Sequence, residues 1–308
     1  MKVIALTPRG YCHGVVSAIQ TLKTVASDPT IKKPIHVLGM VVHNQKIVDD
    51  FTALGVISIN DAKASRLELI DTISHGTVVI TAHGVSDDVI AQARHNNLEV
   101  IDTTCRDVKR SQDTVKYYLS MGYDVIFIGK KSHPESETVL QYSSAVHLVD
   151  SVAMVDKLTL NNPLVALTNQ TTMSVFDVQD IGEKVRHKYP HVEVIEALCD
   201  ATKTRQLAVM HQDKDTDHCF VVGDKRSHNA NKLVEVSNSH GVSASLIQSI
   251  EDIHLPSLKH HTKVSVTSGA STPTALTKEV IEFLSQFNKD DPKTHHQVSQ
   301  VKDQNLFL

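Results

Sequence analysis

The sequence predicts an α/β protein made of three similar units whose sheets are mostly parallel. Two observations support this fold class. Short apolar, β-branched segments alternate with longer amphipathic segments along the chain, which is typical of parallel sheets covered by helices. In addition, Cys12, Cys105 and Cys199 each follow an apolar segment, 93 residues apart (12 to 105) and 94 residues apart (105 to 199). Such a long period indicates repeated structural units.

Nine segments are expected to form strands, because their apolar residues run almost without interruption, as in strands buried on both faces. They are residues 2–8, 34–42, 77–83, 98–105, 123–129, 163–170, 192–199, 218–224 and 263–269. Segments 174–189 and 272–287 have the spacing of amphipathic helices. The first segment has too few apolar residues for a secretory signal, so we expect a cytoplasmic protein.

The repeat also predicts the domain organisation. We expect a first α/β unit over residues 1–98, a second over 99–195 and a third over 196–290. Residues 291–308 are polar until their end and lack clear periodicity. We therefore expect them to form a C-terminal tail.

Composition narrows the function classes. The 308 residues are 41% apolar and 21% charged, with a formal net charge of −4, as in an ordinary globular protein. This balance gives no global electrostatic reason to expect nucleic acid or an anionic membrane as a partner. No stretch reaches the roughly 18 apolar residues of a membrane span.

Polar clusters recur after the second and third strands of each predicted unit. The second strand is followed by a cluster containing a histidine, and the third by a cluster of imidazole or hydroxyl groups. The residues are His43, His133 and His228 after the second strands, and His83, Thr171 and Ser271 after the third. Open α/β sheets bind ligands at the carboxyl ends of their strands. Three units around a pseudo-threefold axis would bring these loops and the three thiols to one centre.

The three repeated cysteines are compatible with more than one chemistry. One cysteine at the end of a strand is usually only a small buried side chain, but three at equivalent positions favour a metal site. Zinc with three thiolates and an open position fits, and so does an iron–sulfur cluster that leaves one iron without a protein thiolate. Cys219 breaks the repeat and is expected to be buried inside a strand.

The loops that follow the strands are also suited to an anion. They supply imidazoles together with the neutral donors Ser227, Asn229, Ser271, Thr171 and Thr172. Helices are expected to begin immediately after most of these loops, and their first N–H groups attract phosphate. We therefore predict a phosphate or diphosphate pocket, although any one of these residues could simply be a helix N-cap. Glu135 stands out as an acid among donors and is a candidate proton donor.

Nine short motifs together resemble one family. PRGYCHGV, MVVHN, TAHGVS, DTTC, HPE, NQTTMS, LCDATKTRQ, SHNANKL and TSGASTP follow one another between residues 8 and 273. In this order they are similar to the motifs of the LytB/IspH family, the 4-hydroxy-3-methylbut-2-enyl diphosphate reductases. The resemblance implies a three-domain trefoil around a central 4Fe–4S cluster.

The resemblance also implies an activity and a site. The activity is reductive removal of the allylic hydroxyl group of the substrate, which gives isopentenyl and dimethylallyl diphosphate in the last step of the non-mevalonate pathway. Electrons would come from a ferredoxin or flavodoxin. The implied cluster ligands are Cys12, Cys105 and Cys199. The implied diphosphate ligands are His43, His83, Ser227, Asn229 and Ser271, with His228 beside them. His133, Glu135 and Thr171 would surround the hydroxyl group, and Glu135 would supply protons.

Some positions depart from the family pattern. The family usually has alanine at Thr103, proline at Arg106, glycine at Thr138, an apolar or aromatic residue at Asp200 and serine at His228. These departures motivate one alternative, a diverged paralogue that uses the cluster only as a redox sensor. A second alternative is a zinc hydrolase of a phosphorylated metabolite.

Overall fold

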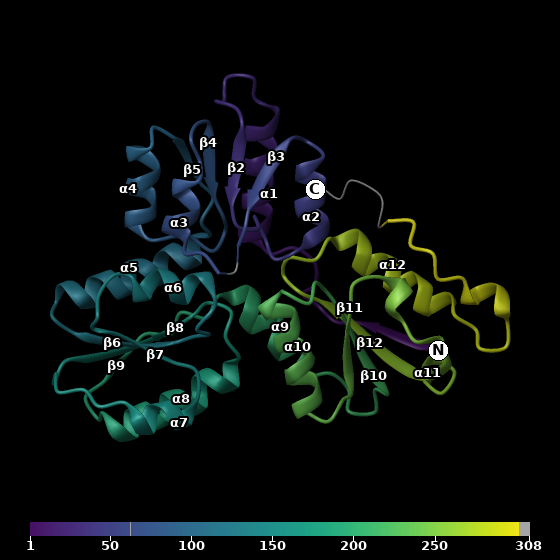
Figure 1. Ribbon diagram of the computed structural model, residues 1–308. Helices are drawn as coiled ribbons and strands as arrows, with labels where there is room; N and C mark the ends of the chain where they lie inside the picture. Colours follow the sequence, from purple (N-terminus) through teal and green to yellow (C-terminus); the bar gives the residue numbers. More distant parts are fainter. Residues whose placement is uncertain (62, 302–308) are drawn as a thin grey trace. The chain divides into compact units, whose positions relative to one another are not determined.

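The computed structural model describes residues 1–61 and 63–301 (Figure 1). Within them lie three four-stranded sheets in which every strand pair is parallel. This confirms the predicted fold class of three α/β units with parallel sheets. The chain also divides into two compact bodies. Body 1 comprises residues 1–16, 43–50 and 200 onward, and body 2 comprises residues 17–42 and 51–199.

The first sheet in body 2 has the strand order β3-β2-β4-β5. Its strands are β2 (Ile35–Leu38), β3 (Val56–Ile59), β4 (Thr77–Ile80) and β5 (Glu99–Asp102). Helices α3 (Arg66–Asp71) and α4 (Asp87–His95) pack on it through a buried apolar cluster that includes Leu38, Ile70 and Val89. The division between the bodies falls within α1 (His13–Ser27) and α2 (Gln45–Thr52).

The second sheet in body 2 has the order β7-β6-β8-β9. Its elements are β6 (Asp124–Ile128), β7 (Val146–Val149), β8 (Val165–Asn169), β9 (Glu193–Val194), α5 (Arg106–Ser120), α6 (Pro134–Leu140), α7 (Val152–Lys157) and α8 (Val175–Lys188). Ile126 and Ile128 of β6 pack in one apolar cluster with residues of α7 and α8. Val125 and Phe127 pack in another with residues of α5 and α6. Helices on both faces explain why this strand is apolar and buried from Val125 to Ile128.

Body 1 contains the third sheet, in the order β1-β12-β10-β11. Its elements are β1 (Lys2–Ala5), β10 (His218–Val222), β11 (Ala244–Ile247), β12 (Lys263–Ser268), α9 (Asp200–Met210), α10 (His228–Ser239), α11 (Leu255–Leu258), α12 (Thr274–Gln286) and two short 3₁₀ turns, η1 (Ile250–Asp252) and η2 (Pro292–His295). Helix α12 packs against β1 and β12, and α10 against β10 and β11.

The three sheets share one topology. Two of their strands lie in a different unit from the one predicted by the sequence. In each sheet the strand that leads to a cysteine lies at one edge: β1 beside β12, β5 beside β4 and β9 beside β8. Thus β1, expected in the first unit, lies in the sheet of the third, and β5, expected at the start of the second unit, completes the sheet of the first. The predicted boundaries between the units, near residues 98 and 195, otherwise stay a prediction.

The nine predicted strands all contain an observed strand, but three further strands were not predicted. These are β3, β7 and β11, the second edge strand of each sheet. Each is only partly buried, so its apolar pattern is weaker than that of the central strands. An edge strand with one covered face gives less sequence signal than a central strand.

The predicted tail is hydrogen-bonded to body 1 over its first part. The Gln297 side chain donates to the carbonyl oxygens of Ile250 and Ile253, at 2.8 and 2.7 Å. The Ser299 hydroxyl donates to Glu279 at 2.7 Å. Residues 302–308 of the predicted tail lie outside the described residues. Among the helices that the structure describes, none is long and apolar enough to cross a lipid bilayer.

Candidate active site

The three repeated cysteines occupy equivalent places in the three sheets. Each lies just beyond an edge strand, is partly exposed and is a thiol rather than part of a disulfide. The backbone N–H of each donates to a carbonyl in the loop after the neighbouring strand. The bonds are Cys12 to Ala270 at 3.0 Å, Cys105 to Ala82 at 3.0 Å and Cys199 to Thr171 at 3.1 Å. By contrast, Cys219 is fully buried inside β10. The equivalent placement explains the near-equal spacing of the first three in the sequence.

Body 2 holds Glu135 in a buried hydrogen-bonded position. Its side chain is 3% exposed. One carboxylate oxygen accepts the backbone N–H of Thr171 and the other accepts the Thr171 hydroxyl, both at 2.9 Å. Burial raises the pKa of Glu135 to about 7, even though both hydrogen bonds lower it. A carboxyl group in this state exists in both its acid and its base form at neutral pH, as a general acid requires.

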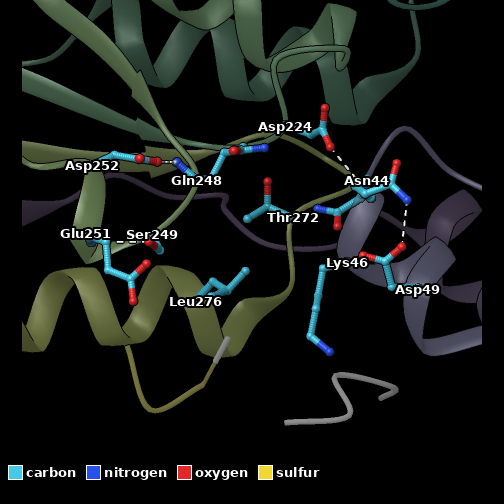
Figure 2. Close-up of a pocket in the computed structure, with 12 residues that line it drawn as sticks. Asn44, Lys46, Asp49, Asp224, Gln248, Ser249, Glu251, Asp252, Thr272 and Leu276 are labelled. Atoms are coloured by element: carbon cyan, nitrogen blue, oxygen red, sulfur yellow. Dashed lines mark hydrogen bonds between the residues drawn. The ribbon is translucent and has the colours of Figure 1, made fainter. Parts of the chain in front are cut away.

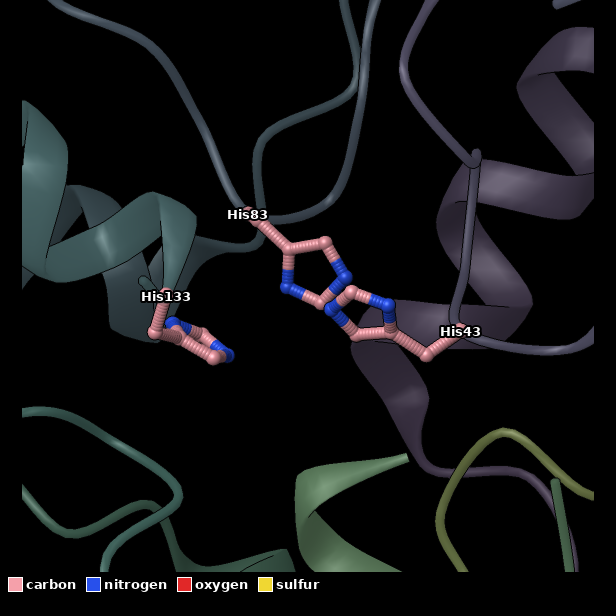
Figure 3. A group of neighbouring side chains, drawn as sticks. All are labelled: His43, His83 and His133. Atoms are coloured by element: carbon pink, nitrogen blue, oxygen red, sulfur yellow. The ribbon is translucent and has the colours of Figure 1, made fainter. Parts of the chain in front are cut away.

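His133 begins the helix that carries Glu135. Its Nδ1 accepts the backbone N–H of Glu135 at 3.2 Å, and Pro134 follows as the first residue of α6. Because Nδ1 is an acceptor, the neutral ring carries its proton on Nε2. The His83 ring lies edge-on to the His133 ring, with centroids 5.6 Å apart (Figure 3). Body 2 therefore brings together His83, His133, Glu135 and Thr171.

Body 1 places its predicted anion ligands at the start of α10. Ser227 is the N-cap, and its hydroxyl oxygen accepts the Ala230 N–H at 3.3 Å. His228 is the first helical residue, and Asn229 is 6% exposed. The close approach of this helix requires two glycines at strand ends. A Cβ at Gly223 or Gly269 would lie 2.7 or 2.9 Å from the Cβ of Ala230.

Asn229 has unused hydrogen-bonding capacity within the described residues. Its Nδ2 donates to the Thr202 hydroxyl oxygen at 3.3 Å, while its buried Oδ1 accepts no hydrogen bond from any of them. Rotation of the amide by 180° would let Thr202 donate to Oδ1 and would leave the NH₂ group, a donor, in the other position. Either way, one side of this amide is available to a ligand.

His43 and Ser271 also lie together in body 1. The Ser271 hydroxyl donates to the backbone carbonyl of His43 at 3.0 Å. His43 lies on the segment that leads into α2 (Figure 3). The predicted site residues are thus distributed over both bodies. Body 1 carries Cys12, His43, Ser227, His228, Asn229 and Ser271, and body 2 carries Cys105, Cys199, His83, His133, Glu135 and Thr171.

A cavity of about 460 Å³ lies beside this group in body 1 (Figure 2). Its lining includes Asn44, Asp49, Asp224, Ser249 and Thr272, and none of the predicted anion ligands. The sequence reasoning missed Asp224, although it occupies the same polar loop as Ser227. Glu135 was predicted because it is an acid in a loop of hydrogen-bond donors. Asp224 fits the same description, so the same criterion identifies it.

Comparison with known proteins agrees with this arrangement of loops. The profile of the LytB protein family matches residues 3–285. The chain belongs to the LytB family. The match covers all three sheets and every cysteine-bearing loop, so the resemblance seen in the motifs extends over nearly the whole chain.

Several LytB relatives carry a stated activity. The chain is 47% identical over 296 residues to the 4-hydroxy-3-methylbut-2-enyl diphosphate reductase of Geobacillus sp. strain WCH70, covering 96% of this chain and 93% of that protein. It is 45% identical to the enzyme of the same name from Geobacillus thermodenitrificans, covering 99% and 97%. A solved structure, the E-1-hydroxy-2-methyl-but-2-enyl-4-diphosphate reductase of Plasmodium falciparum, superposes with a TM-score of 0.86 at 31% identity, covering 94% and 89%.

The departures from the LytB/IspH motifs around Cys105 and in α6 fit their local structure. The Thr103 hydroxyl donates to the Ile80 carbonyl at 2.5 Å, so this buried side chain is hydrogen-bonded. Arg106 is the exposed first residue of α5. Thr138 lies inside α6, and Asn97 is the one residue other than glycine with positive φ in the described chain. Replacement of glycine by Thr138 therefore introduces no backbone strain.

Two further departures lie at helix starts. Asp200 is the first residue of α9, where an acid complements the helix dipole. His228 is the first residue of α10, next to the Ser227 cap. None of the five departures changes a predicted cluster ligand or Glu135.

Proposed function

We propose that the chain is a 4-hydroxy-3-methylbut-2-enyl diphosphate reductase. The observation that carries the proposal is Glu135, a buried acid with a pKa of about 7 held by two hydrogen bonds from Thr171, in a chain of the LytB family. Reductive removal of an allylic hydroxyl group breaks the C–O bond and consumes two electrons and two protons. The products are an alkene and water. Isopentenyl and dimethylallyl diphosphate are the two alkenes that protonation of the allylic carbons can give.

We propose Cys12, Cys105 and Cys199 as the ligands of a 4Fe–4S cluster. Their thiol state, partial exposure and equivalent positions fit such a group, and a buried Cys219 does not. When bound, a cluster with three protein thiolates leaves one iron open to a substrate oxygen and supplies electrons one at a time. A reducing compartment such as the cytoplasm would keep these thiols available.

Substrate binding would rest on the donors in the loops. His43, Ser227, His228, Asn229 and Ser271 from body 1, with His83 from body 2, are proposed to hold the diphosphate. The start of α10, a helix of 12 residues, adds backbone N–H groups and the positive end of its dipole. The Ser271 hydroxyl, which donates to the His43 carbonyl, would turn toward a phosphate oxygen. Held at the diphosphate, the substrate would present its hydroxyl end in a fixed orientation.

Proton delivery is assigned to Glu135. Its acid form would protonate the departing hydroxyl oxygen, and Thr171 would keep the carboxyl group in place through both of its hydrogen bonds. His133, with its proton on Nε2, is proposed to donate a hydrogen bond to the same oxygen. Burial of Glu135 excludes water from the carboxyl group and favours its protonated form.

The electron donor is proposed to be a small redox protein, a ferredoxin or a flavodoxin. The two alternatives considered from the sequence would not use every part of this site. A redox sensor needs no proton donor and no diphosphate ligands, and a zinc hydrolase needs no supply of electrons.

Two measurements on anaerobically reconstituted protein test the proposal. We expect iron and sulfide in equal amounts with visible iron–sulfur absorption, and oxidation of a chemical reductant only when substrate is present. Zinc without iron would support the hydrolase. A cluster whose reductant is consumed no faster with substrate than without it would support the sensor. Either result would overturn the reductase.

A further inference from the structure

Asp224 is a buried carboxylate that joins two segments far apart in the sequence. It is 3% exposed and follows β10. It accepts the backbone N–H of Gln45, the first residue of α2, at 2.9 Å. Figure 2 shows this bond as a dashed line from Asp224 to the start of α2. The same carboxylate accepts the Arg226 N–H at 2.9 Å, Nε at 3.0 Å and Nη2 at 2.8 Å.

Arg226 extends the connection to the side chains of α2. Its Nη1 donates to the Gln45 side-chain oxygen at 2.7 Å. Gln45 in turn donates through Nε2 to Asp49, also at 2.7 Å. A guanidinium group that binds a carboxylate through two of its nitrogens has a fixed orientation. Asp224 and Arg226 therefore fix both the backbone and the first side chain of α2.

Both joined segments carry proposed diphosphate ligands. His43 lies two residues before Gln45, and its carbonyl also accepts the Ser271 hydroxyl. On the other side, the Asp224 carbonyl accepts the Ser227 N–H at 2.9 Å, and Ser227 caps α10. The hydrogen bonds of Asp224 thus connect the His43 segment directly to residues 227–229, the N-cap and first residues of α10.

We propose that Asp224 and Arg226 are positioning residues, a clamp that holds the His43 segment and residues 227–229 at the start of α10 in the arrangement that binds the diphosphate. The inference rests on the proposed function and deepens it. Neither side chain needs to touch the substrate. Their effect is to arrange the donors before the ligand arrives, which reduces the ordering that binding requires.

The negative charge of Asp224, considered alone, would weaken diphosphate binding rather than strengthen it. An unpaired carboxylate close to a diphosphate repels it, and Arg226 offsets that charge. Burial by itself would raise the pKa of Asp224, but hydrogen bonds from Arg226 and Gln45 outweigh it and lower the pKa. Asp224 is therefore an anion at neutral pH. If charge decided the outcome, Asp224→Asn would tighten diphosphate binding, whereas loss of a clamp must weaken it.

The test measures the affinity of the cluster-loaded protein for inorganic diphosphate, by titration calorimetry. We expect D224N and R226Q each to weaken binding about tenfold, as for the loss of one charge-assisted hydrogen bond. The double variant should bind diphosphate as well as the single variant with the lower affinity does, because both residues act as one unit. R226K keeps the charge but loses the two-nitrogen contact, so its affinity should lie between those of R226Q and the wild type. With substrate, KM should rise in these variants while kcat and iron content stay unchanged.

Asp217→Asn is the matched control. Asp217 also joins distant backbone groups, since it accepts the N–H groups of Thr262 and Lys263 at 2.6 and 2.9 Å. It lies next to the first residue of β10, at the other end of that strand from Asp224. D217N should lower the melting temperature without changing diphosphate affinity.

The possible outcomes separate the two proposals. Wild-type or tighter affinity in D224N, or equal weakening in D217N, would overturn the clamp and leave the proposed function intact. If D224N does not fold, wild-type affinity in R226K and R226Q overturns the clamp. A wild-type protein that does not bind diphosphate would overturn both proposals.

Discussion

The carboxylate of Glu135 accepts both the backbone N–H and the hydroxyl of Thr171, each at 2.9 Å. Glu135 lies on the helix after β6, and Thr171 lies in the loop after β8. The two strands are neighbours in one sheet. Parallel pairing brings the carboxyl ends of both strands to the same edge, and thus brings the two residues together. The pair sets the state of the proposed acid, because burial raises its pKa while the Thr171 bonds lower it.

Thr171→Val should therefore shift the pH dependence of turnover. Loss of the hydroxyl removes one hydrogen bond that favours the charged carboxylate, so the pKa of Glu135 rises further. Since the acid form is required, turnover in the wild type should fall as pH rises through about 7, and in T171V it should fall at a higher pH. The measurement is kcat against pH under anaerobic conditions.

Thr172→Val is the control for this shift. The Thr172 hydroxyl oxygen accepts a hydrogen bond from the Gln170 side chain at 2.8 Å, whereas the hydrogen bonds that lower the pKa of Glu135 come from Thr171. Its pH profile should match the wild type. An unchanged profile in T171V, or a shift to lower pH, would contradict the role assigned to Glu135.

Glu135→Gln should separate chemistry from binding. Glutamine has nearly the same shape but cannot deliver a proton, and general acid catalysis contributes about 10²–10⁴-fold. We expect E135Q to retain the cluster and substrate affinity and to lose turnover by that factor. Glu137→Gln, an exposed acid on the same helix, should behave like the wild type. Turnover of E135Q within a few-fold of the wild type would remove Glu135 from the catalytic set.

The cysteines give a prediction with an internal control. Cys12→Ser, Cys105→Ser and Cys199→Ser should each abolish cluster occupancy, because each replaces one of three equivalent thiolate ligands. Cys219→Ser should leave it intact, since Cys219 is buried within β10. Iron and sulfide are quantified after anaerobic reconstitution. Full iron content in C105S, or its loss in C219S alone, would contradict the assignment.

The diphosphate ligands should affect affinity and not the cluster. His43→Ala, His83→Ala and Asn229→Ala should each weaken substrate binding by about 10- to 150-fold, because a hydrogen bond to a charged group contributes roughly 1.5–3 kcal/mol. Asn238→Ala is the control at the other end of α10, where the Asn238 side chain accepts the Ala244 N–H at 2.9 Å. Wild-type affinity in all three variants would show that the anion binds elsewhere.

Much of the fold could be predicted because its signals are local and repeated. The central strands are buried on both faces, so their apolar runs are continuous. The three cysteines recur because each lies in the segment that follows an edge strand in the same sheet topology. The pairing of β1 with β12 could not be predicted, since about 260 residues separate the strands and a parallel strand carries no local mark of its partner. The partly exposed edge strands β3, β7 and β11 were missed for lack of a strong apolar pattern.

The residues of the candidate site could be predicted from their types and from their positions after predicted strands. The sequence indicated Glu135 because it is an acid among donors, but its pKa depends on burial and on Thr171, which lie beyond any motif. Thr138 replaces a family glycine, and only the structure shows that a helical backbone accommodates it there without strain. The link from Asp224 to Gln45 spans 179 residues. Contacts of this kind depend on how loops meet after folding, and spacing along the chain does not encode them.

The reductase assignment is tested most directly by product analysis after anaerobic incubation with 4-hydroxy-3-methylbut-2-enyl diphosphate and a chemical reductant. Mass spectrometry reports whether the substrate has lost its hydroxyl oxygen while keeping both phosphates. We predict isopentenyl and dimethylallyl diphosphate from the wild type, in amounts matched by the electrons consumed, and almost none from E135Q in the same time. Unchanged substrate, or release of phosphate with the hydroxyl group retained, would contradict the assignment.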